Sequence, residues 1–180
     1  PNNTGSGQCW ESAQSWSVYT VTYTIDRNTL PTSFGWDSSI HGAAQTWTNV
    51  SPSHFEFVYS TNSNNVVSYG DTQDENALGE TGGNLLLFSW SEITERWTVI
   101  NSDVSWDTNN IPDENNPDIN GSTTTHNIQN VMTHEFGHWL RLLHSGCTSA
   151  TMYFAITSYG EIKKITLDIA DEDAINWQYP

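Results

Sequence analysis

Hydrophobic and polar residues alternate in several short segments of the 180-residue chain. In residues 18–25, β-branched and aromatic side chains repeat with a period of two, and this pattern predicts a first strand. Residues 54–59 and 66–69 predict a second and a third strand in the same way. The run of β-branched and aromatic residues over 97–106 predicts a further buried strand. We expect these strands to form a sheet.

Apolar residues recur at steps of three and four in two longer segments, which predicts helices there. The first segment, residues 34–50, has its apolar positions at Trp36, Ile40, Ala43, Ala44, Trp47 and Val50. The second has them at Ile128, Val131, Met132, Phe136, Trp139, Leu140 and Leu143, after a hydroxyl cap expected within residues 123–125. A closing helix is expected over residues 170–179, with acidic residues in its first turn. The first helix would lie across the sheet.

The second helix carries residues typical of a metal site. His134 and His138 lie four residues apart, one helical turn, so both imidazoles can bind the same ion. Glu135 can reach a water on that ion without being a ligand itself. A catalytic zinc needs three protein ligands, and His144 is the expected third. The chain must then turn between Trp139 and His144, since a continuous helix would carry His144 out of reach.

The pattern His-Glu-x-x-His with a third His six residues later resembles the metzincin metallopeptidases. Ser149 to Tyr153 resembles the Met-turn of that family, which implies that Met152 lies beneath the metal as an apolar floor. Metzincins have Gly at the position of Arg141, so the resemblance implies a left-handed backbone there, at a cost of roughly 1–2 kcal/mol. Ser145 after the third His, and Phe154 where other subfamilies have a metal-binding tyrosine, favour the matrixins among the metzincins.

The resemblance implies an α+β fold of the metzincin, zincin-like type. Such a fold has a mixed twisted sheet with a backing helix and an active-site helix, then a small C-terminal subdomain that ends in a helix. It implies a single metallopeptidase catalytic domain over residues 1–180, with an extended segment over 1–15, an upper subdomain over about 16–144 and a lower one over about 145–180. Residues 84–90 come where matrixins have the edge strand of the cleft, to which an extended substrate can add as a strand.

The resemblance also implies a zinc-dependent endopeptidase acting on peptides or proteins. One zinc held by His134, His138 and His144 would activate a water, with Glu135 as the general base. The alternative is a catalytically impaired binding domain that keeps the fold and a structural zinc. Because Glu135 is present together with all three ligands, the sequence favours the enzyme.

The specificity pocket follows from the same resemblance. In matrixins the residue four positions before the first ligand lies at the pocket floor, and here it is Asn130. Phe154 and Ile156 fall in the stretch that forms the pocket wall. A medium or large apolar substrate residue after the cleaved bond is the expected preference, and the protein is expected to act as a monomer.

The chain is strongly acidic, with 5 Lys and Arg against 21 Asp and Glu and a formal net charge of −16. This balance excludes electrostatic binding to nucleic acid or to an anionic membrane, and weakly favours cationic peptides. No apolar run is long enough to span a bilayer. Two loops, residues 71–83 and 107–122, are rich in carboxylates, so each is either a calcium site or a solvated acidic loop.

The two cysteines, Cys9 and Cys147, are expected to form a disulfide, as a cysteine pair in a secreted domain usually does. Closing so long a loop would stabilise the fold by about 4–5 kcal/mol in the chain-entropy model. The alternative is the propeptide cysteine of matrixins, which occupies the zinc. Gln8 and Trp10 do not match the residues that flank that cysteine, so the disulfide is favoured. The chain begins without a signal peptide, and we expect the mature part of a secreted protein.

Overall fold

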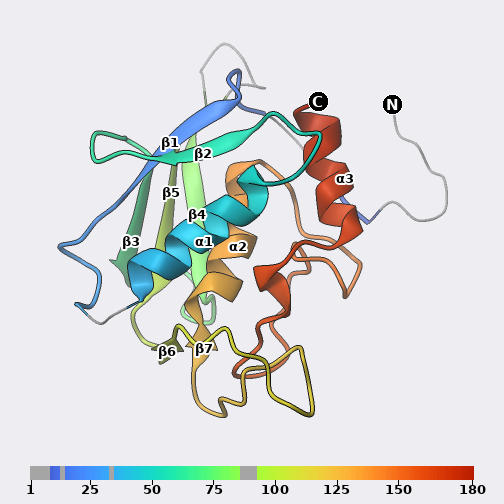
Figure 1. Ribbon diagram of the computed structural model, residues 1–180. Coiled ribbons are helices and arrows are strands. Elements are labelled where there is room, and N and C mark those ends of the chain that lie inside the picture. The colour runs from blue at the N-terminus through green and yellow to red at the C-terminus, as the bar shows by residue number, and fades with distance from the viewer. Residues whose placement is uncertain (1–8, 13–14, 33–34, 86–92) are drawn as a thin grey trace.

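The computed structural model describes residues 9–12, 15–32, 35–85 and 93–180 (Figure 1). Its strands are β1 (Thr20–Ile25), β2 (Glu56–Tyr59), β3 (Val66–Gly70), β4 (Gly79–Leu85), β5 (Ile93–Asn101), β6 (Trp106–Asp107) and β7 (His126–Asn127). Its helices are α1 (Trp36–Thr48), α2 (Ile128–Trp139) and α3 (Ile169–Gln178), with a short 3₁₀ helix at Lys163–Ile165. The expected α+β class is confirmed.

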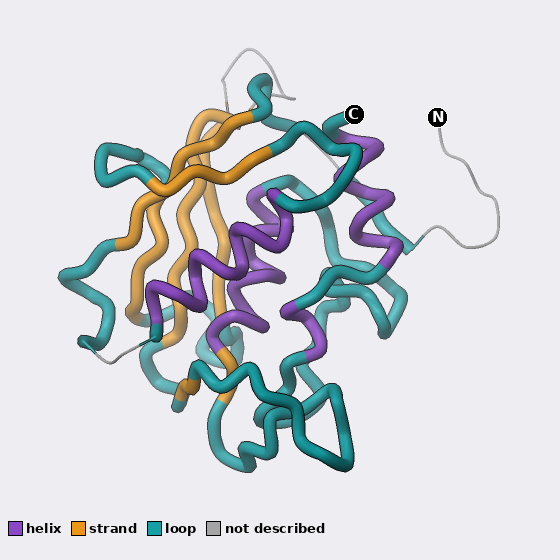
Figure 2. Tube along the Cα trace, in the orientation of Figure 1, coloured by secondary structure: helices purple, strands orange, loops and turns teal. Residues whose placement is uncertain are grey.

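Five strands form one mixed sheet in the order β2-β1-β3-β5-β4. All neighbouring strands are parallel except β4, which runs antiparallel to β5 and occupies one edge. Helices α1 and α2 cross one another over the same face of the sheet, and α3 stands to one side of them (Figure 1). Strands β6 and β7 form a separate small pair, and the chain between them is almost entirely loop, as predicted (Figure 2).

The alternation predicted for the first strand is present in the burial of its side chains. Val21, Tyr23 and Ile25 are buried in the core, whereas Thr20 and Thr22 are exposed. One face of β1 therefore packs against the helices while the other contacts solvent, as a half-buried strand requires.

The helical patterns are also confirmed, with one exception. Every apolar position predicted for residues 34–50 is buried, and so is every one predicted for the second helix except Leu143, which is 41% exposed. Leu143 departs from the pattern because α2 ends at Trp139 and the chain then changes direction. None of the helices in the described parts of the chain has the length and apolarity needed to span a bilayer.

The strands on the β4 side of the sheet differ from the predicted ranges. Strand β4 begins at Gly79, inside the segment predicted as an acidic loop, and β5 covers Ile93–Asn101 rather than 97–106. Residues 86–92, which include most of the predicted edge segment, lie outside the described residues. Strand β4 contains three glycines and shows no alternation in sequence, so its extended form depends on pairing with β5.

Candidate metal centre

Helix α2 begins at an amide cap. Asn127 has an extended backbone, and its Oδ1 accepts a hydrogen bond of 2.9 Å from the Asn130 N–H. The hydroxyl cap expected within residues 123–125 is therefore wrong, because Thr125 instead donates its hydroxyl to Asp107. Side chains of Ser, Thr, Asn and Asp can all cap a helix, and only the backbone conformation of Asn127 distinguishes them here.

Helix α2 ends in a left-handed turn at Arg141. With φ of 64°, Arg141 is the one residue other than glycine with positive φ among the described residues. The Arg141 N–H donates to the His138 carbonyl at 3.0 Å, and the Leu142 N–H donates to the Gly137 carbonyl at 3.1 Å. These are the two hydrogen bonds of a Schellman motif. The predicted turn before His144 is confirmed.

The turn brings His144 to the two histidines of α2. One ligand atom from each of His134, His138 and His144 lies within 4.8 Å of the others. The Nε2 atoms of His138 and His144 are 3.2 Å apart. Two nitrogens that share a tetrahedral zinc at about 2.0–2.1 Å are separated by about 3.3 Å. This pair of imidazoles therefore already has the separation that a shared zinc requires.

Backbone carbonyls orient two of the imidazoles. His134 Nδ1 lies 2.7 Å from the Thr151 carbonyl oxygen, and His138 Nδ1 lies 2.8 Å from that of Leu142. A ring nitrogen that bonds to a carbonyl must carry the proton, which leaves Nε2 with its lone pair for a metal. Burial lowers the pKa of His134, His138 and His144. The three side chains are thus held in the neutral form that binds metal.

Glu135 is 5% exposed and lies at the end of a chain of hydrogen bonds. Its Oε2 accepts a hydrogen bond of 2.7 Å from the Thr81 hydroxyl in β4, and that hydroxyl lies 2.7 Å from the Thr98 hydroxyl in β5. The Trp139 indole N–H donates to Thr98 Oγ1 at 2.8 Å. The Thr81 hydroxyl uses its only hydrogen in the bond to Glu135, so the Thr98 hydroxyl is the donor in the bond to Thr81. Burial raises the pKa of Glu135 to about 7, and the Thr81 hydrogen bond opposes this rise.

Comparison with known proteins agrees with this geometry. The matrixin family model matches residues 15–180. The chain belongs to the matrixin family. It is 30% identical over 170 residues to an interstitial collagenase of Bos taurus, across 93% of this chain and 32% of the collagenase. It is 29% identical over 142 residues to matrix metalloproteinase-26 of Homo sapiens, across 77% of this chain and 49% of that protein. The chain thus spans about a third of the collagenase and about half of matrix metalloproteinase-26.

Family and geometry together point to zinc as the metal of this matrixin. In the parts of the chain that the structure describes, the three histidines are the only group of His, Cys, Asp or Glu side chains able to hold a metal together. Within the described residues, the carboxylates of the two acidic loops do not form a group of this kind. Asp107, for example, accepts hydrogen bonds from Thr125 and Asn120 of its own loop. Calcium binding stays a prediction.

Met152 packs against the helix that carries two of the ligands. A Cβ atom built on Gly137 would lie only 2.2 Å from the Met152 sulfur, so the absence of a side chain there lets the two segments meet. Asp171 of α3 accepts hydrogen bonds from the backbone N–H groups of Thr151 at 2.7 Å and Met152 at 3.2 Å. Because the Thr151 carbonyl bonds to His134, α3 supports the first ligand through this turn. The sequence placed Asp171 only in the first turn of a helix.

The ligands and Glu135 line a cavity of about 700 Å³, which also includes Gly79 and Thr81 of β4. Of the predicted pocket residues, Phe154 and Ile156 line this cavity. Asn130 does not lie on its lining. It is fully buried, and its Oδ1 accepts a hydrogen bond of 2.6 Å from the Lys164 N–H.

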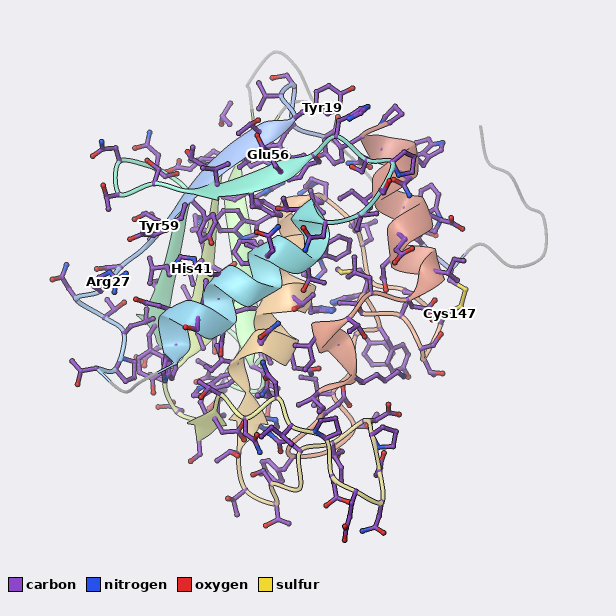
Figure 3. The ribbon with its side chains drawn as sticks, in the orientation of Figure 1. Tyr19, Arg27, His41, Glu56, Tyr59 and Cys147 are labelled. Carbon is purple, nitrogen blue, oxygen red and sulfur yellow. A yellow bond between two sulfur atoms is a disulfide. The ribbon has the colours of Figure 1, made fainter. Side chains whose placement is uncertain are left out.

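The predicted disulfide joins Cys9 to Cys147, across 138 residues of sequence (Figure 3). The Ser145 hydroxyl, next to the third ligand, donates a hydrogen bond to the Cys9 carbonyl. The N-terminal segment is therefore attached beside His144.

Sequence reasoning missed Thr81 and Thr98, the two hydroxyls that connect Glu135 to the sheet. Nothing in the local pattern marks them, because threonine is common in strands. They meet only through the β4–β5 register, in which Thr81 and Thr98 are opposite each other. Only a correct prediction of how β4 and β5 pair could have identified these two threonines.

Proposed function

We propose that this matrixin is a secreted zinc endopeptidase with Glu135 as its general base. The observation that carries the proposal is the position of Glu135, buried in the same cavity as the three imidazoles and held by Thr81 as a hydrogen-bond acceptor. A zinc bound by the three histidines would lower the pKa of a water and polarise the scissile carbonyl. Glu135 takes a proton from the attacking water and passes it to the leaving amine.

The cleft suits an extended peptide. Strand β4 lies at the edge of the sheet and contributes to the cavity lining, so a peptide can add to it as a further strand. Phe154 and Ile156 give the cavity an apolar wall for the side chain after the cleaved bond, and Asn130 supports Lys164 of the same cavity through its hydrogen bond. The catalytic unit spans the whole chain and works as a monomer, with the cleft between residues 16–144 and 145–180.

The disulfide supports secretion, since such bonds persist in oxidising compartments.

The test is cleavage of a mixed peptide library by the wild type and by Glu135→Gln, with the zinc content of both proteins measured. Glutamine has nearly the same shape as glutamate but cannot take the proton. We expect one zinc per chain in each protein and a loss of about 10²–10⁴-fold in cleavage rate for the variant.

A specific outcome would favour the alternative, a binding domain with a structural zinc. If both proteins contain zinc and neither cleaves any peptide, the site holds metal without catalysis. If Glu135→Gln cleaves as fast as the wild type, another group acts as the base.

A further inference from the structure

The few basic side chains of this acidic protein gather at the cavity. The chain has only five, at Arg27, Arg96, Arg141, Lys163 and Lys164. Three of them, Arg96, Arg141 and Lys164, line the same cavity as the ligand histidines. The carboxylates of Asp74 and Glu80, also on the lining, accept hydrogen bonds from the backbone of their own loop. The cavity lining therefore carries three basic side chains beside three carboxylates, those of Asp74, Glu80 and Glu135, and is far less acidic than the molecule as a whole.

Arg96 is buried, and two nitrogens of its guanidinium have no hydrogen-bond partner among the described residues. The residue is 3% exposed, and the two nitrogens are Nε and Nη2. Among the described residues the one ion pair joins Arg27 to Asp37, so Arg96 has no carboxylate there. Burial and, to a smaller extent, the nearby charge of Arg141 lower the pKa of Arg96 to about 10. Buried cations are normally paired, so Arg96 is destabilising unless an anion joins it.

The sheet makes room for this side chain. Arg96 lies two residues before Thr98 in β5, on the same buried face of the strand. Opposite it in β4 is Gly83, where an added Cβ would lie 2.6 Å from Arg96 Nη1. The guanidinium therefore lies under the edge strand, on the face of the sheet where Thr98 leads to Glu135.

Arg141, at the same cavity, also lowers the stability of the fold, because its backbone is in the left-handed conformation. Its left-handed backbone costs about 1–2 kcal/mol that glycine would avoid, and the Schellman turn has no need of a side chain at that position. Strained residues tend to cluster at functional sites. Two basic residues, one buried and one strained, thus line one cavity, and a bound anion would pair with the buried one.

We propose that Arg96 and Arg141 form an anion subsite that receives a carboxylate of the peptide substrate. The proposal rests on the endopeptidase function proposed above. A guanidinium offers a planar fork of donors that matches a carboxylate, and a peptide supplies carboxylates as Asp and Glu side chains or at its C-terminus. The acidity of the whole chain favours cationic peptides at long range, but close to the cleft the subsite selects an acidic group.

The test compares matched peptides built around a cleaved sequence. One set has Glu or Gln at each position in turn, and a second set ends in a free acid or an amide. We expect wild-type kcat/KM to favour the Glu peptide at one position by about tenfold or more, mainly through KM. A preference for the free acid instead of any Glu position identifies the C-terminal carboxylate as the ligand.

Two variants assign the preference to these residues. Arg96→Met is expected to bring the Glu-to-Gln ratio close to one, and to melt at or above the wild-type temperature because an unpaired buried charge is removed. Arg141→Gly keeps the turn, and we expect it to lower the ratio without loss of zinc. Arg27→Met is the control and keeps the wild-type ratio, since Arg27 pairs with Asp37 and does not line this cavity.

Equal cleavage of Glu and Gln peptides at every position, with no preference for a free acid, would overturn the subsite. So would a preference that survives in both arginine variants. If the zinc-loaded protein cleaves nothing, the endopeptidase proposal fails, and the subsite is then tested by calorimetric binding of Glu-rich and Gln-matched peptides to the zinc-loaded protein. Equal affinities for those peptides would count against it.

Discussion

Thr81 shows how much a single hydroxyl contributes to the site. Its side chain donates to Glu135 at 2.7 Å, while its own position is fixed by pairing with Thr98 across the sheet. A carboxylate bound in this way is held in one orientation and kept available as a proton acceptor. Thr81 acts through Glu135, so it is a positioning residue.

We expect Thr81→Val to reduce kcat about tenfold with little change in KM or zinc content. Valine keeps the shape of threonine but has no donor, and a hydrogen bond to a charged group typically contributes about 1.5–3 kcal/mol. Steady-state kinetics with metal analysis measure the effect. Thr81→Ser is the matched control and should keep most of the activity, because it retains the hydroxyl. Equal kcat for the valine variant and the wild type would exclude a positioning role.

At the level of elements, α2 is held from several sides. Trp16 Nε1 donates to the Trp139 carbonyl at 2.9 Å, and Gln178 Nε2 donates to the Leu140 carbonyl at 2.8 Å. These bonds satisfy carbonyls that a helix end leaves without partners. The Met152 side chain packs on Gly137, between the two turns that carry His134 and His138. The ligand geometry therefore depends on how closely α2 approaches its neighbours.

We expect Gly137→Ala to destabilise the fold by about 1–3 kcal/mol and to weaken zinc binding. The new Cβ would lie 2.2 Å from the Met152 sulfur and 2.9 Å from the Trp47 ring, and packed cores tolerate such additions poorly. Urea unfolding and zinc competition measure the two effects.

Gly42→Ala is the matched control for this substitution, because Gly42 also lies inside a helix. There the added Cβ meets only the flexible end of Gln129, and alanine is the better helix former by about 1 kcal/mol. Its stability should equal or exceed that of the wild type. Similar losses in both variants would mean that contact with Met152 is not the cause.

At the scale of the whole molecule, the N-terminal segment holds the third ligand in place. The Leu143 N–H donates to the Glu11 carbonyl at 2.8 Å, and Ser12 pairs with Leu142. The disulfide joins the same segment to Cys147, three residues after His144. Residues far apart in sequence thus fix the turn that brings His144 to the other two ligands.

We expect replacement of both cysteines by serine to lower the unfolding free energy by about 2–4 kcal/mol and to weaken zinc binding. The disulfide limits the unfolded chain, and it also restrains the loop beside His144. Chemical denaturation with and without a chelator separates the two contributions. Unchanged zinc affinity in the double variant would show that the hydrogen bonds to Glu11 and Cys9 suffice to hold this loop.

The sequence by itself determined the metal site and much of its support. The spacing of His134, His138 and His144, the need for a turn at Arg141 and the burial of the two main helices all follow from short-range geometry. A helical turn and the end of a helix depend on residues that are neighbours in the sequence, so their positions could be predicted from it. The fold class could also be predicted, because it follows from the order of the predicted elements and from the family motif.

Only the tertiary structure decided what surrounds that site. The β4–β5 register places Thr81 near Glu135 and buries Arg96 beneath Gly83, and the packing of α3 brings Asp171 to the Met-turn. Strand β4 is rich in glycine and carries no periodic signal, so its pairing is chosen by contacts across the sheet. Such contacts join residues that are far apart in the sequence. Local sequence patterns do not predict which distant residues will meet, so these contacts could not be derived from the sequence alone.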